Sequence, residues 1–300
     1  MELRHLRYFV KLADTLSFSE AARELCITQS SLSQQIKLLE QEFNTQLFFR
    51  DSHSVEISEA GAELLPFAQN AINAADLCRD RMSDLQDMLV GTLNIGVTYS
   101  FSPILSETIF TFMHRFEGVK LNVYYKPMAE LMEMLNRREV DFVLAYRPSL
   151  PMPGIESHIL FQNYLAAIVS NSHPLAKLDS VSINELNKYS FALPSKGLQA
   201  RNALERIRER HPFDLKIRIE LNDPNILLEL VKQSNMVTIL AEASVRSSTD
   251  VKAVRLDIPD NEMDGCVHAL ANSYHKRSMQ EFVRILSESI AVKVRANAWL

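Results

Sequence analysis

Residues 28–40 read TQSSLSQQIKLLE, and on a helix their apolar and polar side chains separate onto two faces. The apolar face carries three aliphatic side chains: Leu32, Ile36 and Leu39. The opposite face carries hydroxyl, amide and ammonium groups at spacing i, i+3, i+4 and i+7: Ser30, Ser33, Gln34 and Lys37. In the DNA major groove, glutamine pairs with adenine, serine with several bases and lysine with guanine. This face therefore has the chemistry of base-edge recognition, although the polar residues alone would fit a solvent-exposed helix better.

A second group of polar side chains follows strand-like segments of the C-terminal part, the position at which α/β proteins bind ligands. Ser102 precedes a proline, which is typical of a helix start, and the free amides there could hold an anion together with Thr98 and Ser100. Arg147 follows VDFVLAY and is placed to meet such an anion. Each residue alone could instead be a helix cap, a core side chain or a surface group, an interpretation favoured for Ser102 and Asn222. The candidate ligand contacts are Thr98, Tyr99, Ser100, Phe101, Tyr146, Arg147, Ser195, Asn222 and Thr238.

The helix that carries the first group must be positioned by its neighbours, and residues 1–58 contain the signals of a small helical domain. Ser17 with Glu20 three residues later predicts a capping box at a helix start. Thr28 is a good N-cap for the next helix, so two short helices joined by a tight turn follow a longer first helix. Asn44 can adopt the left-handed conformation that ends a helix, and the alternation after it predicts a small two-stranded wing.

Residues 59–90 predict one long helix with an apolar heptad seam. The seam recurs at alternating spacings of four and three residues: Leu64, Ala68, Ala71, Ala75, Cys78, Met82, Leu85 and Leu89. A helix packed on its own domain would explain the seam, and so would a coiled coil between two copies of the chain. The change of pattern from Gly91 onward favours the dimer.

From residue 91 onward, short β-rich runs alternate with helical stretches, which predicts an α/β fold with mostly parallel sheets. The strand-like runs are TLNIGV, VKLNVYY, VDFVLAY, YLAAIVS, YSFALP, DLKIRIEL and MVTILA. Residues 91–300 suit two linked lobes with a cleft between them. We expect lobe 1 at about 91–162 and 266–300, and lobe 2 at about 163–265.

Composition narrows the class of protein. The 300 residues carry a net charge of −5, so nothing in the whole-chain charge argues for nucleic-acid binding. Residues 1–60 hold six Lys and Arg against nine Asp and Glu, which predicts modest affinity for random DNA. We find no signal-peptide pattern, no apolar run of membrane-spanning length and no metal-type cysteine spacing. The sequence also lacks a Gly-rich phosphate loop, HExxH, GxSxG and CxxC, so no catalysis, metal or cofactor is expected.

The segment FVKLADTLSFSEAARELCITQSSLSQQIKLLEQEFNTQLFFR and the wing ending ISEAGAELLPFA resemble those of LysR-type transcriptional regulators. The length, the long helix and the α/β remainder beginning TLNIGV match too, so the resemblance covers essentially the whole chain. It implies an α/β protein with an N-terminal all-α winged helix-turn-helix, a long linker helix and a two-lobed effector domain similar to periplasmic binding proteins. The implied function is sequence-specific DNA binding switched by a small molecule held between the lobes. The alternative is a solute-binding or protein-interaction module without DNA binding.

The resemblance also implies roles for residues of the N-terminal domain. Arg50 matches the family's arginine at the base of the wing and should contact the DNA backbone or minor groove. Arg4 is a further phosphate candidate, and Thr28 and Gln29 can reach a phosphate at the helix N-terminus. The wing tip, residues 51–54, lacks the cations common in the family, which argues against strong contact between wing and phosphate. The DNA-binding candidates are Thr28, Gln29, Ser30, Ser33, Gln34, Lys37, Arg50 and Arg4.

The expected partners are double-stranded operator DNA, an anionic small-molecule effector, RNA polymerase and further copies of the chain. A homodimer would form through residues 59–90 and pair into a homotetramer, and a two-fold dimer predicts paired half-sites of dyad symmetry. No membrane partner is expected, and the location is expected to be cytoplasmic. Only Cys266 lies in the effector domain, so the redox sensing known in one branch of the family is not expected here.

Overall fold

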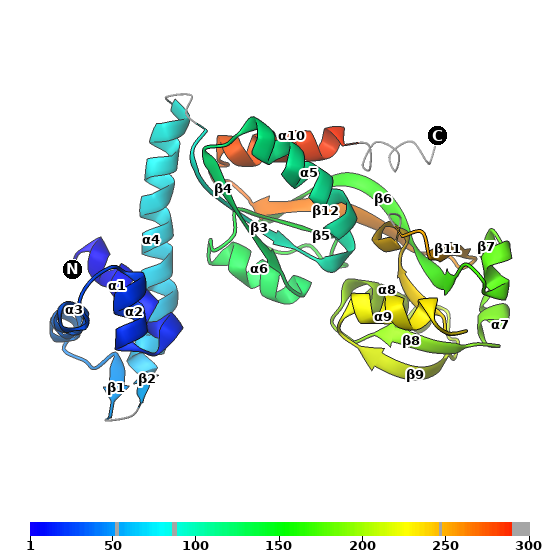
Figure 1. Cartoon of the computed structure of the whole chain (residues 1–300), viewed down its shortest axis with the longest axis horizontal. Coiled ribbons are helices and arrows are strands. Elements are labelled where there is room, and N and C mark those ends of the chain that lie inside the picture. The colour runs from blue at the N-terminus through cyan, green and yellow to red at the C-terminus, as the bar shows by residue number, and fades with distance from the viewer. Residues whose placement is uncertain (52–53, 86–88, 246–247, 290–300) are drawn as a thin grey trace. The chain divides into compact units, whose positions relative to one another are not determined.

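The computed structural model describes residues 1–51, 54–85, 89–245 and 248–289 (Figure 1). The chain forms two compact units. The N-terminal unit comprises residues 1–88 together with 137–139, and the C-terminal unit comprises the other residues from 89 onward. The N-terminal unit is helical apart from one hairpin, and the C-terminal unit is α/β, as the sequence predicts. None of the helices in these ranges combines the length and the apolar character that crossing a membrane requires.

Short helices and a hairpin form the globular part of the N-terminal unit. The elements are α1 (Leu3–Thr15), α2 (Phe18–Glu24), α3 (Gln29–Phe43), β1 (Phe48–Arg50) and β2 (Val55–Ile57). The core contains Leu6, Phe9, Leu12, Ala21, Ala22, Leu32, Ile36, Leu39, Leu47, Phe48, Ala68 and Ile72. Full burial of a large aliphatic or aromatic side chain stabilises a fold by about 1.5–3 kcal/mol. This shared core, more than helix propensity, therefore holds α3 in place.

Local hydrogen bonds set the helix ends. The Ser17 hydroxyl accepts the N–H of Glu20 at 3.3 Å, as predicted. The reciprocal half of the predicted capping box is wrong, because the Ser17 N–H donates to the Thr15 hydroxyl at 3.4 Å and the Glu20 carboxylate pairs with Arg23. Thr15 lies in the turn directly before the cap and reaches this amide first. The left-handed φ of 50° predicted for Asn44 ends α3.

The long helix α4 spans Glu59–Leu85. Its first turns pack on the core of the N-terminal unit, where Ala68 and Ile72 are buried. Three residues of the predicted seam are exposed: Ala71, Cys78 and Met82. The side chain of Leu85 lies outside the described residues. One part of the seam therefore packs on its own unit, and a later part faces solvent.

Lobe 1 of the C-terminal unit is a sheet with helices on both faces (Figure 1). Its strands β3 (Gly91–Val97), β4 (Val119–Tyr125) and β5 (Phe142–Tyr146) are parallel, and β12 (Glu262–Leu270) is antiparallel to β5. Helices α5 (Ser102–Arg115) and α10 (Arg277–Glu288) cover one face, and α6 (Met128–Asn136) covers the other. The 3₁₀ turn η1 (Tyr99–Phe101) leads from β3 into α5.

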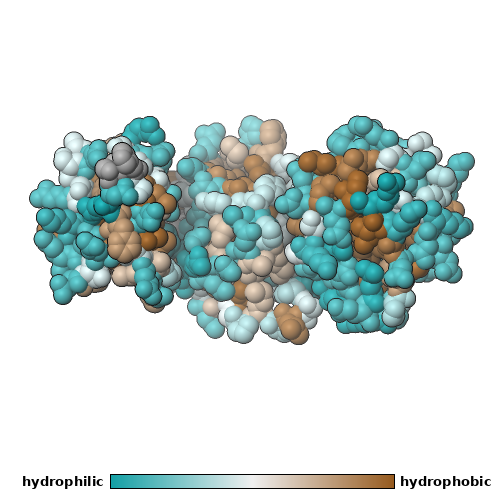
Figure 2. Space-filling model, turned by 90° about the horizontal axis from the view of Figure 1, so that it is seen from below, coloured by the Kyte–Doolittle hydropathy of each residue, from teal (hydrophilic) through white to brown (hydrophobic). Residues whose placement is uncertain are grey.

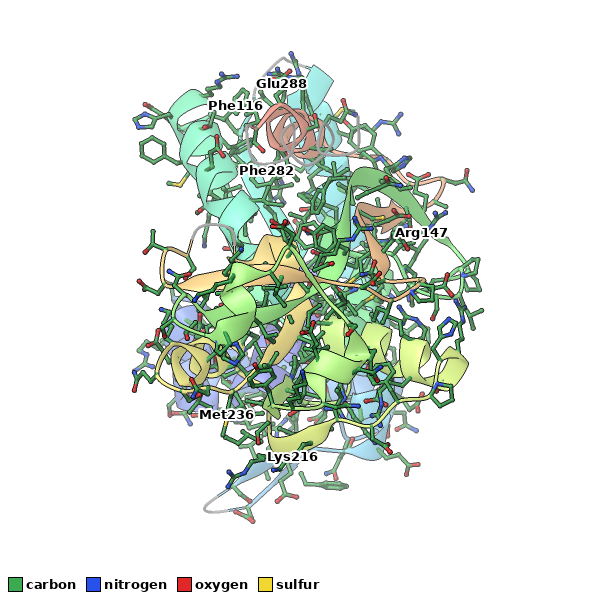
Figure 3. All side chains as sticks on the ribbon, turned by 90° about the vertical axis from the view of Figure 1, so that its right-hand side faces the viewer. Phe116, Arg147, Lys216, Met236, Phe282 and Glu288 are labelled. Carbon is green, nitrogen blue, oxygen red and sulfur yellow. The ribbon has the colours of Figure 1, made fainter. Side chains whose placement is uncertain are left out.

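Strand β5 shows why the sheet needs both helical layers. All of its residues are buried, which is typical of a parallel strand between two layers. Phe142 and Leu144 belong to the core cluster that includes α5 and α10, whereas Val143 and Ala145 belong to the cluster with α6. The ring of Phe282, on the inner side of α10, lies 5.8 Å from that of Phe142 (Figure 3).

Lobe 2 is built on a second set of strands. These are β7 (Ser180–Val181), β8 (Ser190–Pro194), β9 (Lys216–Leu221), β10 (Thr238–Ala241) and β11 (Val251–Leu256). β9 pairs with β8, and a bridge between Phe191 and Val237 joins β8 to the start of β10. The helical elements are η2 (Pro174–Lys177), α7 (Ile183–Leu186), α8 (Gln199–Arg210), α9 (Pro224–Lys232) and η3 (Glu242–Val245). Figure 2 shows apolar surface over the lobe that carries α8 and α9, where Ile226 is 53% exposed.

Strand β6 (Ile155–Ser170) belongs to both lobes. Residues 155–164 pair antiparallel with β12, and from Leu165 onward β6 pairs antiparallel with β10 and β11. The sheets are therefore mixed and not mostly parallel, because the chain enters lobe 2 and returns from it on neighbouring antiparallel strands. The sequence predicts only YLAAIVS, the second half of β6, and misses β7, β11 and β12.

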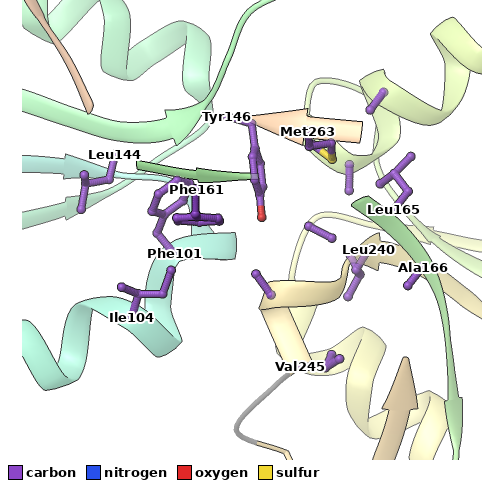
Figure 4. Packing of buried hydrophobic residues seen from close by; sticks show 14 of the residues in the cluster. Phe101, Ile104, Leu144, Tyr146, Phe161, Leu165, Ala166, Leu240, Val245 and Met263 are labelled. Atoms are coloured by element: carbon purple, nitrogen blue, oxygen red, sulfur yellow. The ribbon is translucent and has the colours of Figure 1, made fainter. Parts of the chain in front are cut away.

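A continuous apolar cluster accompanies the crossing strands (Figure 4). Tyr146, at the end of β5, packs against Phe101 and Phe161 with ring centroids 5.4 and 6.4 Å away. Leu165 and Leu240 extend the same cluster into lobe 2. The two lobes are thus joined by packing as well as by strand pairing.

Candidate DNA-recognition helix and effector cleft

Helix α3 has one fully buried face and one open face. Leu32, Ile36 and Leu39 have no exposed surface. On the other side Ser30, Gln34 and Lys37 are exposed and Ser33 is half-buried. Across the described ranges the Lys37 ammonium makes no ion pair or hydrogen bond. Gln34 and Lys37 therefore present a side-chain amide and an ammonium group to solvent.

The first turn of α3 is held by its cap and by α2. The Thr28 hydroxyl accepts the N–H of Ser31 at 3.2 Å, as the sequence predicts, and lies 3.1 Å from the Ser30 hydroxyl. The side-chain oxygen of Gln29 accepts a hydrogen bond from Ser19 of α2 at 3.1 Å. The remaining first-turn amides and the helix dipole favour an anion at this end.

Glu40 links α3 to the hairpin. One carboxylate oxygen accepts the N–H groups of Leu47 and Phe48 at 3.0 and 3.2 Å, and the other pairs with Arg50 at 2.8 Å. The Glu40 side chain is only 13% exposed. Sequence reasoning missed this role, because an acid in a polar helix gives no sign that its partners lie in a following hairpin.

Arg50 lies along the edge of the polar face of α3. Its guanidinium is 4.8 Å from the centre of the Phe18 ring, and one nitrogen is 3.5 Å from the Ser33 hydroxyl. Arg4 pairs with Glu2 at 2.8 Å, and both side chains are well exposed. Residues 52 and 53 of the predicted wing tip lie outside the described residues.

Most acids near α3 are held in local ion pairs. The pairs are Glu2–Arg4, Lys11–Glu24, Glu20–Arg23, Glu40–Arg50 and Glu42 with the N-terminal ammonium. The polar face itself carries no carboxylate, and Glu40 at its edge is paired with Arg50. The formal excess of acid in residues 1–60 is therefore not concentrated where α3 would meet DNA.

A cleft of about 680 Å³ lies between the two lobes of the C-terminal unit, within the range typical of small-molecule sites. Its walls come from the segments after β3 and β4 and from the starts of α8 and α9. The predicted contacts that line it are Thr98, Tyr99, Ser100 and Asn222. Polar residues that sequence reasoning missed also line it: Tyr125, Lys126, Gln199, Asp223 and Asn225.

Two side-chain contacts bridge the lobes beside this cleft. The Tyr99 hydroxyl donates to the side-chain oxygen of Asn225 at 2.6 Å. The Gln199 amide accepts the N–H of Tyr146 at 3.0 Å and donates to the carbonyl of the same residue at 2.8 Å. Burial, and then the carboxylate of Asp223, raise the pKa of Tyr99, so its phenol stays a hydrogen-bond donor at neutral pH.

Three predicted contacts lie away from the cleft wall. Phe101 is fully buried in the core cluster. The N–H of Ser195 donates to the carbonyl of Leu221 at 2.9 Å, and its side chain is not among those that line the cleft. Thr238 is fully buried, and its hydroxyl has no hydrogen-bond partner within the part of the chain that the structure describes. The hydroxyl of Ser102 donates to the carbonyl of Tyr99, as expected of a helix-start residue.

Arg147 and Tyr146 line a second cavity of about 310 Å³. The Arg147 side chain is 57% exposed (Figure 3). Its guanidinium lies 3.4 Å from the carboxylate of Asp264. Ser100 and Arg147, which the sequence predicts to hold one anion together, therefore line different cavities.

Some of the cleft residues that sequence reasoning missed carry a local sequence signal, and others do not. Asp223 precedes Pro224 and caps α9, accepting the N–H of Asn225 at 2.8 Å, so the helix-start signal used for Ser102 was present here as well. Gln199 has no such signal, because its partner Tyr146 is 53 residues away in the chain.

This architecture defines a winged helix-turn-helix protein with a ligand-binding cleft in a two-lobed domain. The family model described as "Bacterial regulatory helix-turn-helix protein, lysR family" matches residues 3–62, and the "LysR substrate binding domain" model matches residues 86–291. The chain belongs to the LysR family of DNA-binding transcriptional regulators that carry an effector-binding domain.

Individual relatives agree with this assignment. The chain is 30% identical to the transcriptional dual regulator GltC of Bacillus subtilis (strain 168), over 86% of each protein. It is 31% identical to the uncharacterized HTH-type transcriptional regulator YnfL of Escherichia coli (strain K12), over 80% of this chain and 82% of that one.

Solved structures share the fold. A full-length OxyR variant from Pseudomonas aeruginosa superposes with a TM-score of 0.73 at 21% identity, covering 97% of this chain and 98% of that one. CbnR in complex with its target DNA gives a TM-score of 0.70 at 19% identity, covering 96% and 99%.

Proposed function

We propose that α3 enters the DNA major groove and reads base edges with its exposed polar face. Ser30, Ser33, Gln34 and Lys37 are the base-reading residues of this proposal. The observation that carries it is the complete burial of Leu32, Ile36 and Leu39, which leaves the opposite face directed outward. Thr28 and Gln29 would meet a phosphate at the helix start, and Arg50 and Arg4 would contact the backbone.

Fluorescence anisotropy with the DNA upstream of the protein's own coding region tests this proposal. Replacing both Gln34 and Lys37 with alanine should weaken specific binding by about 2–6 kcal/mol, if each contact contributes about 1–3 kcal/mol. Gln46→Ala removes an exposed amide from the same unit and serves as the matched control. Unchanged affinity in the Gln34/Lys37 double variant would remove α3 as the reading helix.

Within this proposal the N-terminal domain covers residues 1–58, the linker helix 59–90 and the effector domain 91–300. The linker helix forms a homodimer, because α4 leaves Phe67 69% and Met82 54% exposed outside the core of its own unit. Dimers pair into a homotetramer, the dimer binds half-sites of dyad symmetry, and RNA polymerase is the downstream partner. A regulator of this kind works where the chromosome is, in the cytoplasm.

Sedimentation of full-length variants tests the role of α4. Met82→Glu places a charge on the exposed apolar side of the helix and should shift the protein toward the monomer. Ala62→Glu adds the same charge at an exposed position on the opposite side of α4 and should leave the assembly intact. An unshifted Met82→Glu protein would place the self-association surface elsewhere.

We also propose that the effector is an anionic metabolite held in the 680 Å³ cleft. Thr98, Ser100 and the amides at the start of η1 and α5 would surround its anionic group. Asp223 gives the opposite wall a carboxylate, so the effector should also carry a hydrogen-bond donor or an ammonium group. Tyr99 and Asn222 complete the contacts that this proposal assigns.

Calorimetric titration against a panel of amino acids and small carboxylates tests the effector proposal. Ser100→Ala should weaken binding by about 0.5–1.5 kcal/mol, the usual contribution of one hydrogen bond. Ser287→Ala, which removes an exposed hydroxyl of α10 outside both cavities, is the matched control. A ligand that binds the two variants equally would not use the predicted wall of the cleft.

A further inference from the structure

Gln199 separates two cavities in the C-terminal unit. Its amide is fixed on the Tyr146 backbone by two hydrogen bonds, and its nitrogen lies 2.9 Å from the sulfur of Met128. Gln199 and Met128 line both the cleft of about 680 Å³ and the second cavity of about 310 Å³. The second cavity is therefore a neighbouring chamber with walls of its own.

The second chamber has an apolar lining of methionines. Thioether side chains reach it from α6, from the segment after β5 and from β12: Met128, Met132, Met152 and Met263. Methionine is flexible and polarizable, so such a lining adapts to apolar groups of different shape. The volume is near the lower end of the range for small-molecule sites.

Two arginines from different lobes also line this chamber. Arg147 follows β5 in lobe 1, and Arg206 lies on α8 in lobe 2. The guanidinium of Arg147 makes a 3.4 Å contact with the carboxylate of Asp264 and keeps more than half of its side chain exposed. It can therefore turn toward a second anion without losing a buried partner.

Arg206 differs from the other arginines of α8. Each of the others pairs with a carboxylate at 3.2 Å or less: Arg201, Arg208 and Arg210. In the described ranges, the half-buried guanidinium of Arg206 makes no ion pair or hydrogen bond. Burial, and then the nearby charge of Arg210, lower its pKa, and the carboxylate of Glu209 offsets only part of this effect.

We propose that this chamber is a second ligand site for a small apolar monocarboxylate. The carboxylate lies between Arg147 and Arg206, and the hydrocarbon part packs on the methionines. An anion there supplies the partner that Arg206 lacks, and a guanidinium is suited to bind both carboxylate oxygens. The site is independent of the effector proposed for the larger cleft.

Calorimetry on the full-length protein with hexanoate and hexanamide tests the site. The two probes share size and apolar chain but differ in charge, so hexanoate should bind at least about tenfold more tightly. Arg206→Gln should weaken hexanoate binding by about tenfold. Arg218→Gln removes the same charge from an exposed position of β9 outside the chamber, and Ser100→Ala changes only the larger cleft. Both should bind hexanoate as the unchanged protein does.

Methionine-methyl NMR of the unchanged protein gives a readout that does not depend on any variant folding. Hexanoate should shift the methyl signals of Met132 and Met152, which line the second chamber only. Hexanamide at the same concentration should shift them far less. The proposal is overturned if hexanoate shifts neither methyl signal. It is also overturned if hexanoate binds the Arg206→Gln variant with unchanged affinity. Loss of binding in Ser100→Ala overturns it too, because the probe would then occupy the larger cleft. That outcome would leave the proposed effector cleft standing.

Discussion

The recognition helix and the effector cleft gather their polar groups over very different distances along the chain. The open face of α3 comes from residues 30–37 of one helix, and a local core of short helices orients it. The cleft is bridged by Tyr99 and Asn225, which are 126 residues apart, and its walls belong to two lobes joined by β6. A site on one helix can be recognised from periodicity, whereas a site between lobes exists only once the crossing strands have formed.

The two regions also differ in how their charged side chains are paired. Near α3 most acids are matched by neighbouring cations in local ion pairs, and Glu40 serves the backbone amides of the hairpin as well. In the C-terminal unit, Arg147 and Arg206 come from different lobes. Within the described ranges Arg206 forms no ion pair, and the carboxylate of Glu209 offsets its charge only in part. Unmatched charge thus lies where two lobes meet, the arrangement expected where a ligand completes the site.

The largest effect is expected from Ile36→Ala, which opens a cavity under α3. The N-terminal unit should lose about 2–5 kcal/mol of unfolding free energy, and DNA binding should fall with it. Ligand binding in the C-terminal unit should not change, because the two cores are separate clusters. Denaturant unfolding measures the change in stability, and fluorescence anisotropy measures the change in DNA affinity. The control is Leu38→Ala, because Leu38 lies on the same helix and is 44% exposed. Equal losses in the two variants would contradict a local core as the support of α3.

Glu40→Gln should have the next largest effect. It weakens the pair with Arg50 and the contacts to two hairpin amides, so stability should fall by about 1–3 kcal/mol. DNA affinity should drop as well, because Arg50 is no longer held along α3. Glu42→Gln, which alters a 45% exposed carboxylate of the same helix, should cost far less. If both variants unfold at the same denaturant concentration, Glu40 does not join α3 to the hairpin.

Tyr99→Phe tests the bridge across the cleft and should have a smaller effect. Losing one hydrogen bond to Asn225 should cost the C-terminal unit about 0.5–1.5 kcal/mol and leave DNA binding by the N-terminal unit unchanged. Tyr125→Phe removes a hydroxyl from an exposed tyrosine of the same cleft and is the matched control. Stability equal to that of the control would mean that the bridge does not help to hold the lobes together.

The smallest effect concerns pH and His268. Burial lowers the pKa of this histidine, whose ring nitrogens lie near the Ser157 hydroxyl and the Ala145 carbonyl at 2.8 and 3.2 Å. The unfolded chain therefore takes up the proton first, so stability of the C-terminal unit should fall as the pH drops below about 6.5. His268→Gln should flatten that slope, whereas His158→Gln, at an exposed histidine, should not. Thermal unfolding between neutral and mildly acidic pH measures how the stability of the C-terminal unit depends on pH. If His268→Gln leaves this pH dependence unchanged, His268 does not cause the loss of stability.

Local signals predicted the N-terminal unit well. The cap at Thr28, the left-handed Asn44 and the apolar stripe of α3 are all confirmed, because each depends on residues within a few positions of one another. The reciprocal half of the capping box failed because Thr15 competed for the same amide. Glu40 was missed because its partners come from the hairpin that follows.

The C-terminal unit was predicted in its elements more than in their pairing. Each predicted run is observed as a strand, yet β6 extends far beyond YLAAIVS because residues 155–163 gain their partner only from β12, about 100 residues later. Of the predicted ligand contacts, Thr98, Tyr99, Ser100 and Asn222 line the cleft, and Phe101 and Thr238 are fully buried. The ends of strands can be read from sequence, but the direction in which each following side chain points depends on packing.

By itself the sequence determined the helix-turn-helix, the polar face of α3 and the α/β character of the remainder, because periodicity and capping act over a few residues. Only the tertiary structure decided that Ser100 and Arg147 line different cavities, that Gln199 stands between them and that Arg206 forms no ion pair in the described ranges. Those outcomes depend on how β6 and β12 bring two lobes together, and no local interaction carries that information.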